Sequence, residues 1–254
     1  MASRELMAAI EAAQAAAALI RSLYQTPLTV RTKADASPVT EADVRAEQLI
    51  RATLERHFPK YGFYGEESGP HALEAENLWL VDPIDGTKSF VREMPYFSTQ
   101  IALMHAGEIV LGVSSAPVYN EIAWAEEGGG AFLNERLVRV SAVAALKDAF
   151  LSTGNLKSLT QPQRWQRLGE LVRTVSRIRG YGDFVHYHLL ARGALDVVIE
   201  SDVNILDIAA LVVIVREAGG TFTDLAGAPV GLKTTSVLAS NGVLHDPVLE
   251  ALRP

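Results

Sequence analysis

Two aspartates three residues apart stand in the segment Trp79-Leu80-Val81-Asp82-Pro83-Ile84-Asp85-Gly86-Thr87-Lys88-Ser89-Phe90. Its apolar start predicts a strand, after which Pro83 fixes φ and Gly86 frees the backbone, so that both carboxylates enter a turn. Clustered carboxylates repel each other unless a cation neutralises them, and hard divalent metals prefer oxygen ligands. Asp82 and Asp85 therefore indicate a divalent-metal site, with an acidic turn that caps a helix as the alternative.

Three further features could complete such a site. The residues Gly86-Thr87-Lys88 could open a helix whose free N–H groups bind a phosphate. Upstream, the loop Gly65-Glu66-Glu67-Ser68 carries two acids, and far downstream Asp207 stands at the start of an apolar helix over residues 208–215. An acid at a helix start could also do no more than compensate the helix dipole.

Together these segments resemble the inositol monophosphatase superfamily of magnesium-dependent, lithium-sensitive phosphatases. The likeness rests on the Asp-Pro-Ile-Asp-Gly-Thr core of residues 82–87, on residues 65–68, and on Asp207-Ile208-Ala209-Ala210 followed by Glu217-Ala218-Gly219-Gly220. These motifs occur in the right order over nearly the whole chain. The resemblance implies a phosphomonoesterase that cleaves a small phosphate ester with a metal-activated water and two or three Mg²⁺ ions, with Mn²⁺ as the alternative ion.

The resemblance also implies a role for each matching residue. Those roles fall into metal binding, water activation and substrate binding. Metal ligands would be the side chains of Glu66, Asp82, Asp85 and Asp207 with the carbonyl of Ile84; Asp43 and Thr87 would activate the water together with Glu66; and Gly86, Thr87 and Lys33 would bind the phosphate or lie at the mouth of the site. Asp82 would bridge two metals.

The substrate pocket is expected in the second half of the chain. The motif Arg179-Gly180-Tyr181-Gly182-Asp183-Phe184 is closer to the histidinol-phosphate phosphatases of the superfamily than to its inositol phosphatases. Histidinol phosphate carries an ammonium and an imidazole. A pocket with the acidic residues Asp183 and Glu200 would therefore suit it better than it would suit the phosphate of a neutral sugar alcohol. Alternatively, Asp183 caps the helix that follows it, and Glu200 contacts sugar hydroxyls.

Other substrates and another class of protein remain open. Inositol 1-phosphate is the next candidate substrate, followed by 3′,5′-bisphosphorylated nucleotides and fructose 1,6-bisphosphate. Leu206 stands where the family usually has tryptophan, which leaves the shape of the pocket undecided. A catalytically silent phosphate-binding protein is expected to lack a metal ligand or Thr87, and all are present. His186 and His188 are two residues apart on a predicted helix, so they should face different sides rather than share a metal.

The elements that must position these residues follow an α/β pattern. An alanine-rich helix ends before Pro27, and Thr40 opens a second helix that ends near Arg56. Short apolar runs then predict an antiparallel sheet, and strands alternate with helices after residue 141. We expect a layered αβαβα sandwich in two halves, with an α+β half over residues 1–141 that carries most ligands and an α/β half over 142–254 that carries the substrate pocket and Asp207.

Those elements are expected over specific stretches. Strands are predicted at residues 78–81, 99–104, 109–114, 122–125, 137–140, 149–152, 175–178, 194–199 and 237–240. Helices of the second half are predicted at residues 163–173, 184–191, 208–218 and 246–252.

Composition limits the partners. The chain has 254 residues, 30 acidic and 23 basic side chains, and a net charge of −7, which argues against nucleic acid or an anionic membrane as partner. Without cysteine, its chemistry must rely on oxygen and nitrogen. Glu5 and Glu11 interrupt the N-terminal apolar stretch, so we expect a cytoplasmic enzyme that acts on a small phosphorylated metabolite. The family likeness adds a homodimer.

Overall fold

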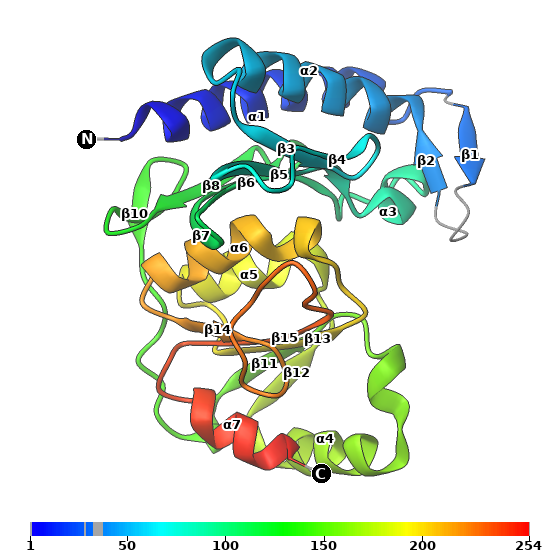
Figure 1. Ribbon diagram of the computed structural model, residues 1–254. Coiled ribbons are helices and arrows are strands. Elements are labelled where there is room, and N and C mark those ends of the chain that lie inside the picture. The colour runs from blue at the N-terminus through cyan, green and yellow to red at the C-terminus, as the bar shows by residue number, and fades with distance from the viewer. Residues whose placement is uncertain (1, 28, 33–37, 254) are drawn as a thin grey trace.

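The computed structural model describes residues 2–27, 29–32 and 38–253. Their helices and sheets stack in five alternating layers (Figure 1). The five layers confirm the expected αβαβα sandwich. Three of them are helix pairs: α1 (Arg4–Leu23) with α2 (Glu41–His57), α5 (Asp183–Ala191) with α6 (Ile205–Glu217), and α4 (Pro162–Thr174) with α7 (His245–Leu252).

The first sheet has eight strands in the order β10-β9-β8-β7-β6-β5-β3-β4. Its neighbours pair antiparallel, as expected, except that β3 runs parallel to β5. Its strands are β3 (Gly62–Gly65), β4 (Gly69–His71), β5 (Asn77–Asp85), β6 (Ser98–His105), β7 (Glu108–Ala116), β8 (Glu121–Glu126), β9 (Gly130–Leu133) and β10 (Arg136–Val138). Strands β3, β4 and β9 were not among those the sequence predicts.

The second sheet is mixed and has the order β12-β11-β13-β15-β14. Its strands are β11 (Phe150–Thr153), β12 (Arg177–Arg179), β13 (Val197–Ser201), β14 (Thr221–Thr223) and β15 (Ser236–Ser240). Strand β13 begins three residues later than the pattern from Ala194 predicts, because the chain turns at Gly193 with φ +74°. The strand also continues two residues beyond the predicted end, to Ser201, so that Glu200 lies inside it. The division into halves at residue 141 falls between the two sheets and stays a prediction.

Short elements join these layers. Helix α3 (Thr87–Val91) follows β5 at the turn where the sequence predicts a helix start. The others are the hairpin of β1 (Val30–Thr32) with β2 (Pro38–Thr40) and the 3₁₀ turns η1 (Leu146–Asp148) and η2 (Lys157–Thr160).

The alanine-rich helix α1 is capped at its N-terminus by Ser3, whose hydroxyl accepts a hydrogen bond from the N–H of Leu6 at 3.0 Å. By length and composition alone this helix could cross a membrane. Its alanine face packs instead on the first sheet, in a buried cluster that includes Ile101 and Val113. The small side chains let helix and sheet approach closely.

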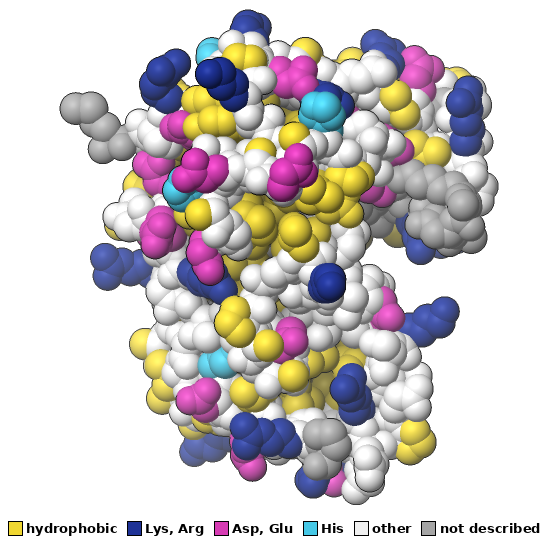
Figure 2. All heavy atoms as spheres, in the orientation of Figure 1, with side chains coloured by type: hydrophobic (Ala, Val, Ile, Leu, Met, Phe, Trp, Pro, Cys, Tyr) yellow, Lys and Arg dark blue, Asp and Glu magenta, His cyan; other side chains and the backbone are white. Residues whose placement is uncertain are grey.

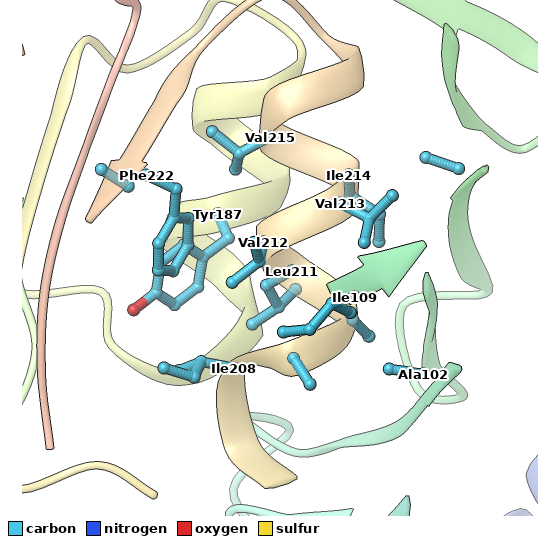
Figure 3. Packing of buried hydrophobic residues seen from close by; sticks show 14 of the residues in the cluster. Ala102, Ile109, Tyr187, Ile208, Leu211, Val212, Val213, Ile214, Val215 and Phe222 are labelled. Carbon is cyan, nitrogen blue, oxygen red and sulfur yellow. The ribbon is translucent and has the colours of Figure 1, made fainter. Parts of the chain in front are cut away.

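Helix α6 is buried between the two sheets, and its residues 208–215 are all inaccessible to solvent. Figure 3 shows its aliphatic side chains packed against α5 and both neighbouring layers. Helix and sheet approach closely at Gly112 of β7, where a Cβ atom would overlap the backbone of Ala210.

On the face shown in Figure 2, Lys and Arg side chains lie scattered among acidic ones.

Replacing Gly112 by alanine is expected to lower the free energy of unfolding by about 1–3 kcal/mol, because the added methyl group must push α6 away from the sheet. Gly169 offers the matched control, since it is exposed in the middle of α4 and a Cβ there meets nothing within 4 Å. Gly169→Ala should raise stability by about 0.5–1 kcal/mol. Urea unfolding measures both, and equal effects would refute the close approach.

Candidate active site

The end of β5 is shaped to present two carboxylates. The pairing of β5 with β6 is regular up to Asp82 and shifts register before Asp85. Within this bulge the N–H of Ile84 donates to Asp82 Oδ1 at 3.0 Å, and the Thr99 hydroxyl donates to the Pro83 carbonyl at 2.8 Å. A bulge re-aims side chains that a regular strand would alternate between faces. It brings both aspartates to the same place.

The turn after β5 requires glycine. Gly86 has φ +91°, and a Cβ at this residue would lie 2.5 Å from the carbonyl oxygen of Tyr96. Helix α3 then begins at Thr87, so that the N–H groups of its first turn point out of the helix toward the end of β5. A helix therefore begins where the sequence predicts one, and its phosphate-binding role stays a prediction. Lys33, the remaining residue expected near the phosphate, lies outside the described residues.

Asp207 comes to the same point from the other half of the chain. It is the third residue of α6 rather than a residue before the helix, and it forms a capping box with Asn204: its Oδ2 accepts from the Asn204 N–H at 2.8 Å and its Oδ1 from the Asn204 side-chain amide at 2.6 Å. Asp82, Asp85 and Asp207 each offer an oxygen within 4.8 Å of the others.

Asp43 occupies the equivalent position of α2. It is the third residue of that helix, fully buried, and its Oδ2 accepts from the Thr40 N–H at 2.8 Å and the Thr40 hydroxyl at 2.6 Å. Its Oδ1 accepts from the hydroxyl of Thr87 at 3.0 Å, a hydroxyl that also lies 3.0 Å from the Ile84 carbonyl. The structure thus joins Asp43 and Thr87, the pair that the sequence analysis assigns to water activation.

Glu66 directly follows β3, whose parallel pairing aligns Gly65 with Val81 of β5. The next residue along both strands brings Glu66 beside Asp82, and the N–H of Glu66 donates to the Val81 carbonyl at 3.1 Å. A glutamate that the sequence analysis missed holds this turn. Buried Glu47 of α2 accepts from the N–H groups of residues 67 and 68 at 2.7 and 2.8 Å. Its place four residues after Asp43, on the same helix face, is the signal that could have found it.

The pKa values reflect crowding of like charges. Burial raises the pKa of Asp82 and of Asp85 well above the usual range of an aspartate, and the neighbouring carboxylates raise it further. Burial likewise raises the pKa of Asp207 to about 7, against the opposing hydrogen bond from the backbone of Asn204. Burial also raises the pKa of Asp43, although hydrogen bonds from Thr40 and Thr87 oppose it.

This donor set fits a hard divalent cation. The three aspartates supply only oxygen, they converge within one ion's reach, and each is more costly to ionise without a positive charge nearby. A bound cation would turn their mutual repulsion into attraction. Asp82, Asp85 and Asp207 are thus the residues that could hold a metal, and Glu66 adds a fourth carboxylate beside Asp82.

Asp183 lies at the start of α5. It is the first helical residue and has φ +46°, while the N-cap position belongs to Gly182. The alternative that Asp183 caps the helix is therefore wrong. Burial raises its pKa to about 6, and the charge of Glu200 adds to the increase. The charges of Asp183 and Glu200 also raise the pKa of Asp85, so both acids lie close to the cluster of Asp82, Asp85 and Asp207.

Glu200 has only 3 % of its surface exposed and three hydrogen-bond donors around its carboxylate. Its predicted contact with substrate stays a prediction. The histidines of α5 face different sides, as their spacing predicts: His186 lies 3.1 Å from Glu200, whereas His188 lies 2.9 Å from Ser114 of the first sheet. Leu206, which replaces the family tryptophan, is buried in the core around α6.

Comparison with known proteins agrees with this geometry. The chain matches the inositol monophosphatase family over residues 2–254. It is 42 % identical to a histidinol-phosphatase of Mycobacterium tuberculosis over 99 % of both chains, and 39 % identical to an inositol-1-monophosphatase of Caulobacter vibrioides over 96 % of this chain and 99 % of that one. The crystal structure of the extragenic suppressor protein suhB from Bartonella henselae is 34 % identical with a TM-score of 0.91, covering 99 % of both chains.

The chain belongs to the inositol monophosphatase family and is a phosphatase of this metal-dependent family, which acts on small phosphorylated substrates.

Mg²⁺ should stabilise the protein more at about pH 7.5 than at about pH 5, because protons on the aspartates compete with the metal. The raised pKa values mean that the folded, metal-free protein holds protons that the unfolded chain releases above about pH 4. The free energy of unfolding of the metal-free protein should therefore fall as pH rises from about 4 to about 7. Thermal melts with EDTA and with Mg²⁺ at both pH values measure this.

Asp82→Asn should melt higher than the wild type without metal and respond less to Mg²⁺, since it removes one of the repelling charges. Glu170→Gln, at a partly exposed position of α4, is the control and should behave as wild type. A shift by Mg²⁺ of the same size at both pH values would contradict the assignment of the cluster.

Proposed function

We propose that this phosphatase is a Mg²⁺-dependent phosphomonoesterase whose preferred substrate is histidinol phosphate, which it hydrolyses to histidinol and phosphate. The observation that carries the reaction type is the convergence of Asp82, Asp85 and Asp207 beside the hydrogen-bonded pair of Asp43 and Thr87. The three aspartates suit a divalent cation that binds the phosphate of a substrate, and the pair of Asp43 and Thr87 suits a water molecule that must lose a proton.

Asp82, Asp85 and Asp207 would hold the metal, with Glu66 and the carbonyl of Ile84 as further oxygen ligands. When bound, Mg²⁺ supplies a water of lowered pKa and charge stabilisation for the phosphoryl oxygens and the leaving group. Mn²⁺ prefers the same oxygen ligands and is the alternative.

The protein's own groups would then handle the protons. A water oxygen bonds to phosphorus as its proton passes to Thr87 Oγ1, and the hydroxyl proton of Thr87 passes to Asp43 Oδ1, 3.0 Å away. The ester P–O bond breaks, the leaving alkoxide takes a proton from solvent water, and Asp43 returns its proton to solvent, so that the two transfers balance. The raised pKa of Asp43 makes this carboxylate a better proton acceptor than an exposed aspartate. The N–H groups of Gly86 and Thr87 at the start of α3 hold the phosphate.

Thr87→Val should lower kcat by at least about a hundredfold with a small change in KM, because it removes the hydroxyl between water and Asp43 without changing side-chain size. Asp43→Asn should have a comparable effect. The double variant should be little worse than either single variant, since the two residues act as one unit. Steady-state kinetics measure this, and additive losses in the double variant would argue against the relay.

The substrate assignment rests on charge. Asp183 and Glu200 place negative charge beside the metal cluster, where an ammonium or imidazolium group on the phosphate ester would be favoured over a neutral alcohol. Relatives named histidinol-phosphatase, at 42 % and 43 % identity, support the same choice. A relative named inositol-1-monophosphatase at 39 % identity makes inositol 1-phosphate the second candidate. The cytoplasmic location and the homodimer expected from the sequence are part of this proposal.

A panel of phosphate esters at fixed Mg²⁺ tests the substrate: histidinol phosphate, inositol 1-phosphate, adenosine 3′,5′-bisphosphate and fructose 1,6-bisphosphate. We expect the highest kcat/KM with histidinol phosphate. A tenfold advantage of inositol 1-phosphate would reverse the ranking, and a folded protein that binds Mg²⁺ but hydrolyses none of them would favour a silent phosphate-binding protein.

Asp183→Asn should lower kcat/KM for histidinol phosphate by about tenfold and change the value for inositol 1-phosphate by less than about threefold, because the lost charge matters only to a cationic substrate. Glu250→Gln, at an exposed position of α7, is the control for removing one negative charge. Equal losses on both substrates would mean that Asp183 acts through structure.

A further inference from the structure

His186 lies at the centre of a buried hydrogen-bond chain that crosses three elements of the second half. Its ring is fully buried, with Nε2 3.1 Å from Glu200 Oε2 on β13 and Nδ1 3.3 Å from the hydroxyl of Ser152 on β11. A carboxylate can only accept, so Nε2 carries the hydrogen and donates. The Ser152 oxygen also accepts from the N–H of Tyr181 at 3.2 Å. One chain of contacts therefore joins β13, α5, β11 and the loop before α5.

Glu200 is fixed from every side in this chain. Besides His186, the hydroxyl of Tyr187 donates to the same Oε2 at 2.8 Å, and the N–H of Asn155 donates to Oε1 at 3.2 Å. Figure 3 shows the ring of Tyr187 beside Phe222 in the core. Gly154 lies so close to Glu200 that a Cβ there would overlap the carboxylate. Burial opposes ionisation, yet the charge and hydrogen bond of His186 hold the pKa of Glu200 below its usual value.

Asp183 depends on the same chain of contacts. It stands one turn before His186 on α5, with φ +46°, a left-handed conformation that is strained for a non-glycine residue. Tyr181, two residues earlier, is tied to Ser152. The strained Asp183 therefore lies in the sequence between Tyr181 and His186, two residues that both contact the hydroxyl of Ser152.

We propose that His186 is a positioning residue for substrate selectivity: by joining Glu200 to Ser152 it fixes residues 180–183, and with them the direction in which Asp183 meets a cationic group of the phosphate ester. This inference rests on the proposed function, because it names a residue that shapes the pocket of that reaction. His186 itself is fully buried and acts only through its partners.

The same helix supplies a matched control. His188 is also buried and also contacts a carboxylate, with Nδ1 3.1 Å from Glu121 and Nε2 2.9 Å from Ser114. Those partners lie on β8 and β7 of the first sheet, and neither is Glu200 or Ser152. A substitution of His188 removes buried hydrogen bonds in general, whereas a substitution of His186 removes the particular contacts to Glu200 and Ser152. The two effects can therefore be compared.

The experiment compares His186→Gln with His188→Gln at fixed Mg²⁺, using histidinol phosphate and glycerol 2-phosphate, an ester with a neutral alcohol. His186→Gln should raise KM for histidinol phosphate about tenfold with kcat within about threefold of wild type, and KM for glycerol 2-phosphate should change less than about twofold. His188→Gln should leave the ratio of the two KM values unchanged. Ser152→Ala, which removes one oxygen, should change this ratio in the same direction as His186→Gln.

Hydrogen exchange gives a readout that needs no substrate. The amide of Tyr181 should exchange at least about tenfold faster in His186→Gln and Ser152→Ala than in wild type or His188→Gln, because it loses its hydroxyl acceptor or the anchor of that hydroxyl. Unchanged exchange, an equal effect of His188→Gln, or equal KM increases for both esters would overturn the inference.

If wild type prefers inositol 1-phosphate, the proposed substrate fails and with it the cationic group that Asp183 would meet. Faster exchange of the Tyr181 amide in His186→Gln and Ser152→Ala would then still show that His186 fixes residues 180–183.

Discussion

The repulsion among buried carboxylates is the constraint on which the rest of this structure depends. Asp82 and Asp85 come from β5, and Asp207 from α6, so that the first sheet and the helix layer must meet at a fixed distance to bring them within 4.8 Å. Without a cation such a cluster pushes its own elements apart. Helix α6 withstands this because it is buried between two sheets over most of its length.

The same reasoning explains where the acids sit in their helices. Asp43 and Asp207 are both the third residue of a helix that begins with a capping box, formed with Thr40 and Asn204. In this position a carboxylate accepts from the backbone N–H of the N-cap residue and lies in the favourable field of the helix N-terminus. The interactions that start each helix also orient its acid, and Asp43 still offers its second oxygen to Thr87.

Local signals in the sequence were enough for most of this arrangement. The apolar run before Asp82, the N-cap at Thr40 and the alanine face of α1 depend on neighbours in the chain, and the strand and the two helices occur where these patterns predict them. The metal cluster could be anticipated because two of its acids are three residues apart. The family resemblance, rather than periodicity, indicated Asp207, whose partners lie more than a hundred residues away.

What could not be predicted depends on contacts distant in sequence. Strand β3 has four residues with glycine at both ends, and its parallel pairing with β5 decides that Glu66 lies beside Asp82. Glu47 looks like an ordinary helical acid until the turn of residues 67 and 68 is placed above it. The sequence likewise does not show that His186 and Tyr187 both contact the carboxylate of Glu200.

These distant contacts divide the site into two parts with different supports. Strand β5 and helix α6 hold the metal-binding acids, whereas α5 holds Asp183 through contacts to β11 and β13. A substitution on the first turn of α5 can therefore alter the charge and shape facing the ester without moving Asp82 or Asp207. Under the proposed function, such a separation would let one catalytic centre serve different phosphate esters, because the charge and shape of the pocket could change while the carboxylate cluster stays in place.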